Sequence, residues 1–521
     1  MPARRRGSAF RTPTQRAQLW EKKMDGETYS RILSRTKHLA LPRITEYQAV
    51  HENLISIVKS VLERLGKSHQ THEYMWYAEE LYKATQTYTG QALQNKVNAI
   101  YAKYRAQKLD DDALMKIANS FGLTPDPIEK IFEIPLAVPG KGAPLVVVAA
   151  ADTPSFLKDR ADIICDGVSD QEDINSAFSF APTVYLCPGT YVIDGPIVIP
   201  SHVQLIGAGP SSVIKLKDNY NADINMIYNS DPVNGNTEIT ISNLTIDGNK
   251  QNQAGGNIIG IYLYNVTSSK VESCTLKNTN DIAIHVIKSE EVALLENTFL
   301  EHNTTLWARE SNHLTISRNT CTSFEDCFVL DGCNNCVISE NSFKMGTYEA
   351  IWLDGYKHPA NYNVISGNHF LNSGDYGIFI DFAHYNVISE NICINTSYDG
   401  IALYFSNNNV FIRNYCENNY FAGIEMYYSI DNLIIGNYLH KNTSYGIYLY
   451  KSSYNLISGN TIRSGGVTGY GIYIAGSEST LNVIEGNNLY QSGTEGDILD
   501  SGTDTRRRDN IGNDGSWLAD A

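Results

Sequence analysis

Three aspartates recur at nearly equal intervals along the chain, at Asp331, Asp354 and Asp381. If each interval is one coil of a repeating structure, their carboxylates stack at about 4.8 Å, the spacing of neighbouring strands. Like charges this close repel each other, so at least one carboxyl pKa should rise. Carboxylates about 5 Å apart suit a retaining glycosidase, whereas next-but-one carboxylates about 9.5 Å apart suit an inverting one.

The glycosidase hypothesis gives each carboxylate a role. Asp354 is the protonated acid, and Asp381 or Asp331 is the nucleophile or base. Glu425 is a further candidate on the same face. A polysaccharide lyase with Arg309 as the base and a bound calcium ion is a second hypothesis. A solvated acidic patch without catalysis is the third, so whether the protein is an enzyme stays open. Apart from that calcium, no cofactor and no metal site is predicted.

Aromatic side chains accompany these carboxylates at equivalent positions of the repeat. Aromatic faces stack on sugar rings while acids and amides bind sugar hydroxyls, so the pattern predicts a groove for an extended glycan. Ladders of aromatic rings that only stabilise a parallel sheet are the alternative. The predicted substrate-binding residues are Tyr262, His285, Trp307, Trp352, Phe379, Tyr404, Tyr427, Tyr448, Tyr450 and Tyr473.

A repeat of about 23 residues, from Gly260 to Leu489, positions all of these side chains. One unit has the pattern N-[VL]-[IF]-x-x-N, first complete at 363–368, and a second unit has the pattern GI-x-[LI]-x, as at Gly377. Apolar residues alternate with period two in the second unit, which predicts a short strand with one buried face. One strand per coil, always in the same direction, predicts parallel pairing and a right-handed coil. The predicted fold is an all-β right-handed parallel β-helix.

The repeated asparagines and most cysteines fall into columns of this repeat. Asn tolerates the left-handed backbone of sharp corners, and stacked amides can hydrogen-bond along a column, so the asparagines are predicted to be scaffold. Cys321, Cys393 and Cys416 occupy a core column. Nine scattered cysteines indicate reduced thiols, and Cys333 with Cys336 has no second pair to complete a zinc site.

Composition and charge divide the 521 residues, which are 42% hydrophobic and 19% charged. Residues 1–145 hold 22 basic and 15 acidic side chains, and the remainder holds 19 and 42, so a mildly basic module precedes an acidic one. A short helix over 170–178 is expected to cap the first coil. The predicted parts are a basic arm (1–43), a small α-helical domain for anchoring or oligomerisation (44–134), a linker (135–144), the β-helix (145–500) and a C-terminal tail (501–521).

The stretch from 161 to 209, which begins ADIICDGVSDQEDINSAF and ends VQLIGAG, resembles the opening of pectate-lyase-like β-helix proteins. That group includes many tail spikes of tailed phages and many surface proteins of archaea and bacteria. Together with the repeats, the resemblance covers about 350 residues and is specific for the fold. The paired Asp and Gly-His-Gly motifs of polygalacturonases are absent, so no catalytic residue is carried over from that branch.

The leading prediction is a virion-associated tail spike or fibre that binds, and in an enzymatic version cleaves, host surface polysaccharide. Residues 1–134 would attach it to other virion proteins, and the resemblance implies a homotrimer. Exposure on the virion surface is expected because no signal peptide and no apolar span for a membrane is present. Nucleic acid is disfavoured as a partner because aromatic interleaving is missing from the basic arm. The alternatives are a non-enzymatic structural or decoration protein, and a free lyase or glycoside hydrolase.

Overall fold

The computed structural model describes residues 56–65, 71–87, 93, 96–97, 100–101, 110–121, 123, 145–463, 469–512 and 514–520. The chain divides into two compact units, residues 1–136 and 137–521. The predicted arm (1–43) and linker (135–144) lie outside the described residues. No helix in the described ranges is both long and apolar enough to cross a membrane.

The described part of the first unit is helical. Residues 56–64, α4 (Thr71–Thr87) and α6 (Asp111–Ser120) are helical, as are the described residues 93, 96–97 and 100–101, and all of these segments contribute to one apolar core. Asp110 caps α6 because its side chain accepts a hydrogen bond from the Ala113 N–H at 3.0 Å. The unit therefore has its own core, as a separate helical module requires.

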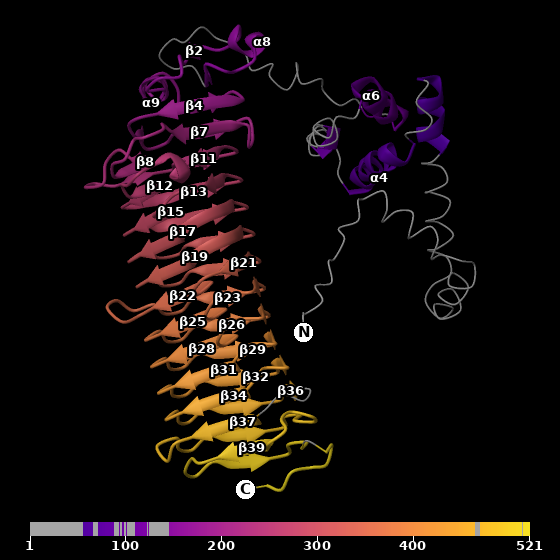
Figure 1. The fold of residues 1–521 in the computed structure, drawn as a ribbon, viewed down its shortest axis with the longest axis vertical. Helices are drawn as coiled ribbons and strands as arrows, with labels where there is room; N and C mark the ends of the chain where they lie inside the picture. Colours follow the sequence, from indigo (N-terminus) through magenta and orange to yellow (C-terminus); the bar gives the residue numbers. More distant parts are fainter. Residues whose placement is uncertain are drawn as a thin grey trace, which may run out of the picture. The chain divides into compact units, whose positions relative to one another are not determined.

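The second unit is a parallel β-helix, drawn in Figure 1 as a stack of arrows, which confirms the predicted architecture. Every strand pairing within its two sheets is parallel. The first sheet contains β1 (Val146–Ala149), β2 (Ile163–Ile164), β3 (Thr183–Leu186), β6 (Gln204–Gly207), β9 (Asn236–Thr237), β10 (Thr240–Ser242), β13 (Val266–Glu272), β16 (Glu290–Leu295), β18 (Thr315–Ser317), β20 (Val337–Ser339), β23 (Val364–Ser366), β26 (Val387–Ser389), β29 (Val410–Ile412), β32 (Leu433–Ile435), β35 (Leu456–Ser458), β38 (Val483–Glu485) and β40 (Arg506–Arg508).

The second sheet has two columns of strands, which the long strands β17 (Thr298–Arg309) and β19 (Thr320–Asp331) join. One column contains β4 (Gly189–Ile193), β7 (Ser212–Leu216), β11 (Thr245–Asp247), β14 (Thr275–Lys277), β21 (Ser342–Gly346), β24 (His369–Leu371), β27 (Ile392–Ile394), β30 (Tyr415–Glu417), β33 (Tyr438–His440) and β36 (Thr461–Arg463). The other contains β5 (Ile197–Ile199), β8 (Ile224–Asn229), β12 (Ile258–Tyr264), β15 (Ile282–Ile287), β22 (Ile351–Asp354), β25 (Ile378–Asp381), β28 (Ile401–Tyr404), β31 (Ala422–Tyr427), β34 (Tyr445–Tyr450), β37 (Tyr470–Ala475) and β39 (Gly496–Asp500).

The interior of the solenoid is filled by the residues that the period-two pattern turns inward. In β22, for example, Ile351 and Leu353 are fully buried, whereas the residues between and after them are half-buried. Phe370, Cys393 and Cys416 align in successive coils, as the core column predicts. All nine cysteines are free and buried, in agreement with the prediction of reduced thiols.

The asparagine ladders pair as predicted, but their backbone conformation is not the predicted one. The Asn414 side chain donates to Asn437 Oδ1 at 3.0 Å and to the Ile388 carbonyl at 2.9 Å, so buried amides are satisfied from coil to coil. The left-handed conformation belongs to the residue before each ladder Asn, such as Arg413 at φ 56°. The reason is that the inward side chain belongs to the ladder, whereas the corner itself is made by an outward residue.

Helices and strands at the two ends differ slightly from the prediction. α9 (Gln171–Ala177) packs against β1, β2, β4 and β5 and covers the first coil, as expected of a cap. A short α8 (Ser155–Lys158) precedes it and was not predicted, and a 3₁₀ turn covers Lys250–Asn252. At the other end β40 pairs with β38, so the solenoid continues past residue 500, its predicted end.

Candidate functional site

The outward face of the strand column from β12 to β37 has the register that the repeat predicts. Tyr262 pairs with His285, which pairs with Trp307, and the alignment continues through Val329 and Trp352. In the neighbouring column Arg309, Asp331, Asp354 and Asp381 align in the same way. Most of these side chains are half-buried, while Trp307 is 37% exposed. We call the coils from β12 to β22 the upper coils, and their predicted site residues therefore share one face.

Trp307 and Trp352 lie on either side of Val329, a small residue with 8% exposure. The far side of Trp307 is occupied by His285, whose ring lies 5.6 Å away at 22°. The far side of Trp352 is occupied by Phe379 at 6.1 Å and 36°. Burial lowers the pKa of His285 to about 4, so this ring is neutral at physiological pH.

The aspartate ladder runs beside these rings and carries perturbed carboxyl groups. Burial, followed by repulsion from Asp354, raises the pKa of Asp381 to about 6. The same two causes raise the pKa of Asp331, which Arg309 partly offsets. The Arg309 Nε lies 3.4 Å from Asp331 Oδ2 and 3.4 Å from Glu310 Oε1. The predicted repulsion between carboxylates contributes to both raised pKa values, but burial is the larger cause. Asp381 therefore keeps its proton up to a higher pH than an ordinary aspartate does.

Glu310 and His358 lie beside the ladder and were missed by the sequence analysis. His358 lies in the loop after β22, and its Nε2 is 3.9 Å from Glu310 Oε1. This coil is longer than its neighbours: the ladder bond from Cys336 to Asn363 spans 27 residues, whereas the next one, from Asn363 to Asn386, spans 23. The extra length was a usable signal, because inserted residues in a solenoid map to loops on one face.

Glu425 is a correction to the predicted exposed face. It is only 4% exposed, and the Tyr404 hydroxyl donates to its Oε2 at 3.1 Å. Asp399, which is fully buried, faces it, and burial raises the pKa of both carboxyls. The Asp399 Oδ1 accepts from the Ala422 N–H at 2.6 Å. Within the described residues these two buried carboxyls have no ion-pair partner, so the pair retains a proton and belongs to the folded interior rather than to the solvent-exposed surface.

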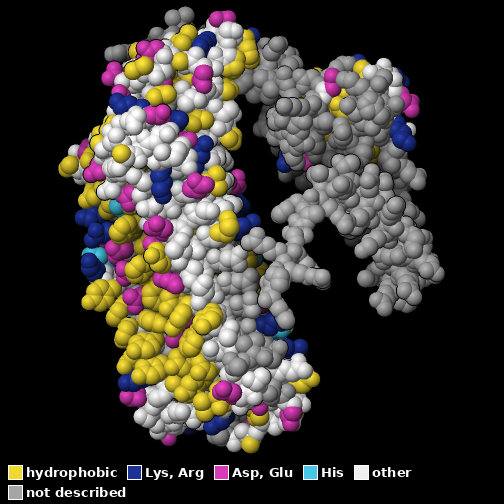
Figure 2. Space-filling model, in the orientation of Figure 1, with side chains coloured by type: hydrophobic (Ala, Val, Ile, Leu, Met, Phe, Trp, Pro, Cys, Tyr) yellow, Lys and Arg dark blue, Asp and Glu magenta, His cyan; other side chains and the backbone are white. Residues whose placement is uncertain are grey.

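The lower coils, from β28 to β37, carry aromatic rings that pack on one another. Figure 2 shows a continuous hydrophobic surface there, in contrast with the charged and polar surface above it. Tyr404 packs against Tyr427 at 5.0 Å, and Tyr427 stacks on Tyr450 at 5.0 Å. Phe382, Phe405 and Tyr428 form a second ladder at 4.8 and 5.2 Å, although none of the three was predicted as a site residue. Tyr448 and Tyr473 are tilted at 51° and lie 5.4 Å apart.

Another acidic group lies at the edge of the strand column. Burial raises the pKa of Glu349 to about 7 and raises that of Asp326, and Asp375 adds to both. Toward the start of the solenoid, a hollow of about 320 Å³ lies on the same face as the predicted residue Tyr262. Its lining consists of Asn225, Tyr228, Asn229, Pro232, Tyr262 and Tyr264.

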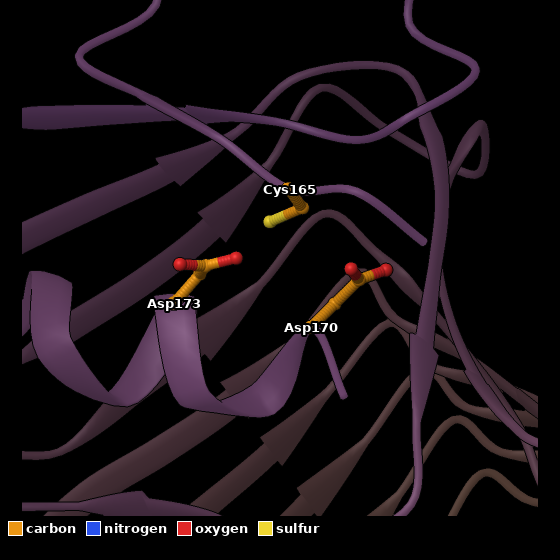
Figure 3. Close-up of side chains that lie close together, drawn as sticks. All are labelled: Cys165, Asp170 and Asp173. Carbon is orange, nitrogen blue, oxygen red and sulfur yellow. The ribbon is translucent and has the colours of Figure 1, made fainter. Parts of the chain in front are cut away.

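Cys165, Asp170 and Asp173 are the one set of metal-ligand side chains that gathers within the described residues, with ligand atoms within 4.8 Å of one another (Figure 3). Both Asp170 oxygens are already used, because they accept from the Gly167 N–H at 2.9 Å and the Val192 N–H at 2.7 Å. Burial raises the pKa of the Cys165 thiol, which disfavours the thiolate that binds metals. The group is therefore explained by the attachment of the capping helix α9.

Comparison with known proteins agrees with this fold. Residues 232–363 and 350–511, more than half of the chain, match the family described as right handed beta helix region. The preneck appendage protein of Bacillus phage PZA is 25% identical over an alignment of 245 residues, and the match covers 39% of this chain and 28% of that protein. Mannuronan C5-epimerase AlgE2 of Azotobacter vinelandii is 36% identical over an alignment of 104 residues, and the match covers 17% of this chain and 10% of that protein.

Among solved structures, tailspike protein 3 of bacteriophage CBA120 has a TM-score of 0.49 at 14% identity, covering 67% of this chain and 59% of that chain. This chain spans less than a third of the length of the two curated relatives.

Proposed function

We propose that this chain, which belongs to the right-handed β-helix family, is a virion appendage that binds a host surface polysaccharide along the outward face of β12–β37. The observation that carries the proposal is the in-register alignment of tryptophans, tyrosines and carboxylates over consecutive coils of this face. The likeness to a phage preneck appendage protein supports the virion part. In this proposal the helical unit attaches the solenoid to other virion proteins, and the appendage is a homotrimer.

A polysaccharide suits this face for physical reasons. Its apolar ring faces pack on aromatic side chains, while its hydroxyls bind carboxylates and amides. The aligned residues extend over many coils, so the face suits an extended chain better than a small compact ligand.

Binding is tested with the full chain and with capsular and lipopolysaccharide preparations, by isothermal titration calorimetry. At least one preparation is expected to bind, and Trp352→Ala is expected to weaken that binding about tenfold or more. Tyr454→Ala is the matched control, because Tyr454 is 54% exposed but precedes β35 in the first sheet. The glycan proposal is wrong if no preparation binds, or if the control weakens binding as much as Trp352→Ala.

The virion part has its own test. Antibody against the solenoid is expected to label purified virus particles, with the label lost when residues 1–136 are deleted from the particle-assembled protein. Particles that lack the protein, or a truncated chain that still assembles, would contradict attachment through the helical unit.

Glycoside hydrolysis is a second candidate function, favoured by the ladder of three carboxylates and by the raised pKa of Asp381. In this version Asp381 is the acid, and Asp354 or Asp331 is the nucleophile or base. New reducing ends without ultraviolet-absorbing unsaturated ends would indicate a hydrolase. Reducing ends together with unsaturated ends would indicate a lyase. In that case, removal of calcium and the variant Arg309→Lys would test whether the ion and the arginine take part. Asp381→Asn should abolish hydrolysis and leave binding in place. Retained hydrolysis would remove Asp381 from the mechanism.

A further inference from the structure

We infer that the hollow of about 320 Å³ between β8 and β12 is a subsite that takes one uncharged sugar ring of the bound polysaccharide. The inference rests on the proposed glycan binding, and it adds the place and the class of one sugar. The lining of the hollow consists of Asn225, Tyr228, Asn229, Pro232, Tyr262 and Tyr264. Small-molecule sites have volumes of about 300–1,000 Å³, so a hollow of this size suits a ligand no larger than one or two sugar rings.

The hollow continues the row of outward rings along which we propose that the glycan lies. Tyr228 in β8 pairs with Tyr262 in β12, which in turn pairs with His285 in β15. Trp307 follows His285 in the same register. Tyr228, which was not predicted as a site residue, therefore extends this row by one coil. A polysaccharide that follows the row reaches the hollow without leaving the outward face.

The tyrosines of the hollow have rings and hydroxyl groups that a ligand can reach. Tyr262 contacts His285 edge to face at 5.4 Å and 87°, on the side away from Tyr228. Within the described residues no other ring packs on Tyr228, and the hydroxyls of Tyr228, Tyr262 and Tyr264 make no hydrogen bond. All three side chains are half-buried. A sugar ring can therefore pack its apolar face on these rings while its hydroxyls bond to the phenols.

The walls of the hollow are held in place by hydrogen bonds of the protein itself. Asn229 is 1% exposed, and its Oδ1 accepts from the Tyr264 N–H at 2.8 Å while its Nδ2 donates to the Tyr264 carbonyl at 3.0 Å. The loop that carries Pro232 is fixed because the Asp231 N–H donates to Asn236 Oδ1 at 2.7 Å. The Asp231 Oδ1 also accepts from two backbone N–H groups of the same loop. A preformed site loses less conformational entropy when it binds a ligand.

The lining favours an uncharged ring. Tyrosine, asparagine and proline side chains carry no charge at neutral pH, so none of the six lining residues can pair with a carboxylate. Lys288, whose Nζ lies 5.9 Å from the centre of the Tyr264 ring, is exposed, so water and salt screen its charge. A uronic acid ring would lose water from its carboxylate without gaining an ion-pair partner in the lining. A neutral ring avoids this cost.

Filling the hollow tests its role in binding. Asn225→Trp adds a large side chain to the lining, and the Asn225 side chain makes no hydrogen bond within the described ranges. Thr240→Trp is the matched control, because Thr240 is also half-buried on a strand but lies on β10 in the first sheet. Calorimetry uses the full chain and the polysaccharide that binds the wild type. Asn225→Trp is expected to weaken binding about tenfold, and Thr240→Trp to leave it within about twofold.

The class of sugar is tested by saturation-transfer NMR with the methyl glycosides of glucose, N-acetylglucosamine and glucuronic acid. The signal that the wild type gives and Asn225→Trp loses belongs to the hollow, since the rest of the face is the same in both proteins. We expect this loss for the two neutral glycosides and not for the glucuronide. A loss that is equal or larger for the glucuronide, or absent for both neutral glycosides, would overturn the uncharged ring.

The outcomes separate the subsite from the proposed function. Polysaccharide binding that survives Asn225→Trp, or that Thr240→Trp weakens equally, overturns the subsite and leaves glycan binding by the face intact. Absence of polysaccharide binding by the wild type removes both proposals. If Asn225→Trp fails to fold, Tyr228→Ala and Tyr228→Phe take its place, and an affinity unchanged in both variants would overturn the subsite.

Discussion

The upper and lower coils of the outward face are built from one repeat and yet differ in what their aromatic residues do. In the lower coils Tyr404, Tyr427 and Tyr450 pack on one another at 5.0 Å, and a carboxyl pair lies beneath them. In the upper coils Trp307 and Trp352 are separated by Val329. The difference shows that aromatic content alone does not define a binding surface. What matters is whether the ring faces are used by other rings.

The two regions also differ in the free energy they contribute. Packed aromatic pairs contribute about 0.5–1.5 kcal/mol each beyond the burial of area, so the lower ladder stabilises the solenoid. Buried polar atoms without hydrogen-bond partners occur in both regions, for example Trp352 Nε1 in the upper coils and Asp399 Oδ2 in the lower coils, and each such atom costs about 1–3 kcal/mol. The packed rings, and not these local costs, distinguish the two regions.

The largest expected effect is on the lower coils. Tyr404→Ala removes a mostly buried ring that packs against Phe379 at 5.2 Å and Tyr427 at 5.0 Å, and it removes the donor to Glu425. We expect the free energy of unfolding to fall by about 2–3 kcal/mol. Denaturant unfolding measures the loss. Tyr404→Phe should cost about 1 kcal/mol, since the ring remains. Equal losses in the two variants would contradict the packing role.

Trp307→Ala should show the opposite pattern in the upper coils. Trp307 is 37% exposed and contacts one ring, so the free energy of unfolding should change by about 1 kcal/mol or less. Polysaccharide affinity should fall about tenfold, which is about 1.4 kcal/mol. Calorimetry and denaturant unfolding on the same preparation check both values. A large loss of stability with retained affinity would remove the distinction between the two regions.

The buried carboxyl pair predicts a pH dependence of the lower coils. Burial raises the pKa of Asp399 and of Glu425, so the folded state retains protons that the unfolded state loses. The stability is therefore fully present at acid pH and decreases as pH rises above the ordinary carboxyl range. Asp399→Asn supplies an amide donor in place of the shared proton and should weaken this decrease. Thermal unfolding of both proteins between about pH 4 and 8 tests it, and parallel curves would contradict it.

The smallest effect is expected at Asp381, between the two regions. Its pKa of about 6 exceeds the ordinary value of 3.8, so its contribution to stability is lost as pH rises through about 6. The asparagine in Asp381→Asn does not titrate, so the free energy of unfolding of the variant should rise relative to that of the wild type between about pH 4 and 6. Above that range the difference between the two proteins should stay constant. Thermal unfolding across this range checks the shape. A constant difference from pH 4 onward would place the raised pKa elsewhere.

The sequence predicted the fold well because each coil repeats the same local rule. Ile351 and Leu353 point inward and Trp352 and Asp354 outward, as alternation requires, and the aspartate ladder has the predicted register. The sequence analysis placed the left-handed corner one residue too late. It assigned both the corner and the side-chain ladder to one asparagine, whereas Arg413 forms the corner and Asn414 forms the ladder bond. It missed His358, which an insertion brings beside the ladder.

The sequence by itself determined the period, the strand direction and the face on which each side chain lies, because these follow from residue types at fixed spacing. Only the tertiary structure decided which outward residues are covered. Glu425 has an outward position but lies buried, since Tyr404 and its neighbours close over it, whereas Trp307 stays exposed beside the small Val329. Whether an outward side chain is buried depends on the sizes of the side chains in adjacent coils and on how their rings tilt. The sequence of a single coil does not contain that information.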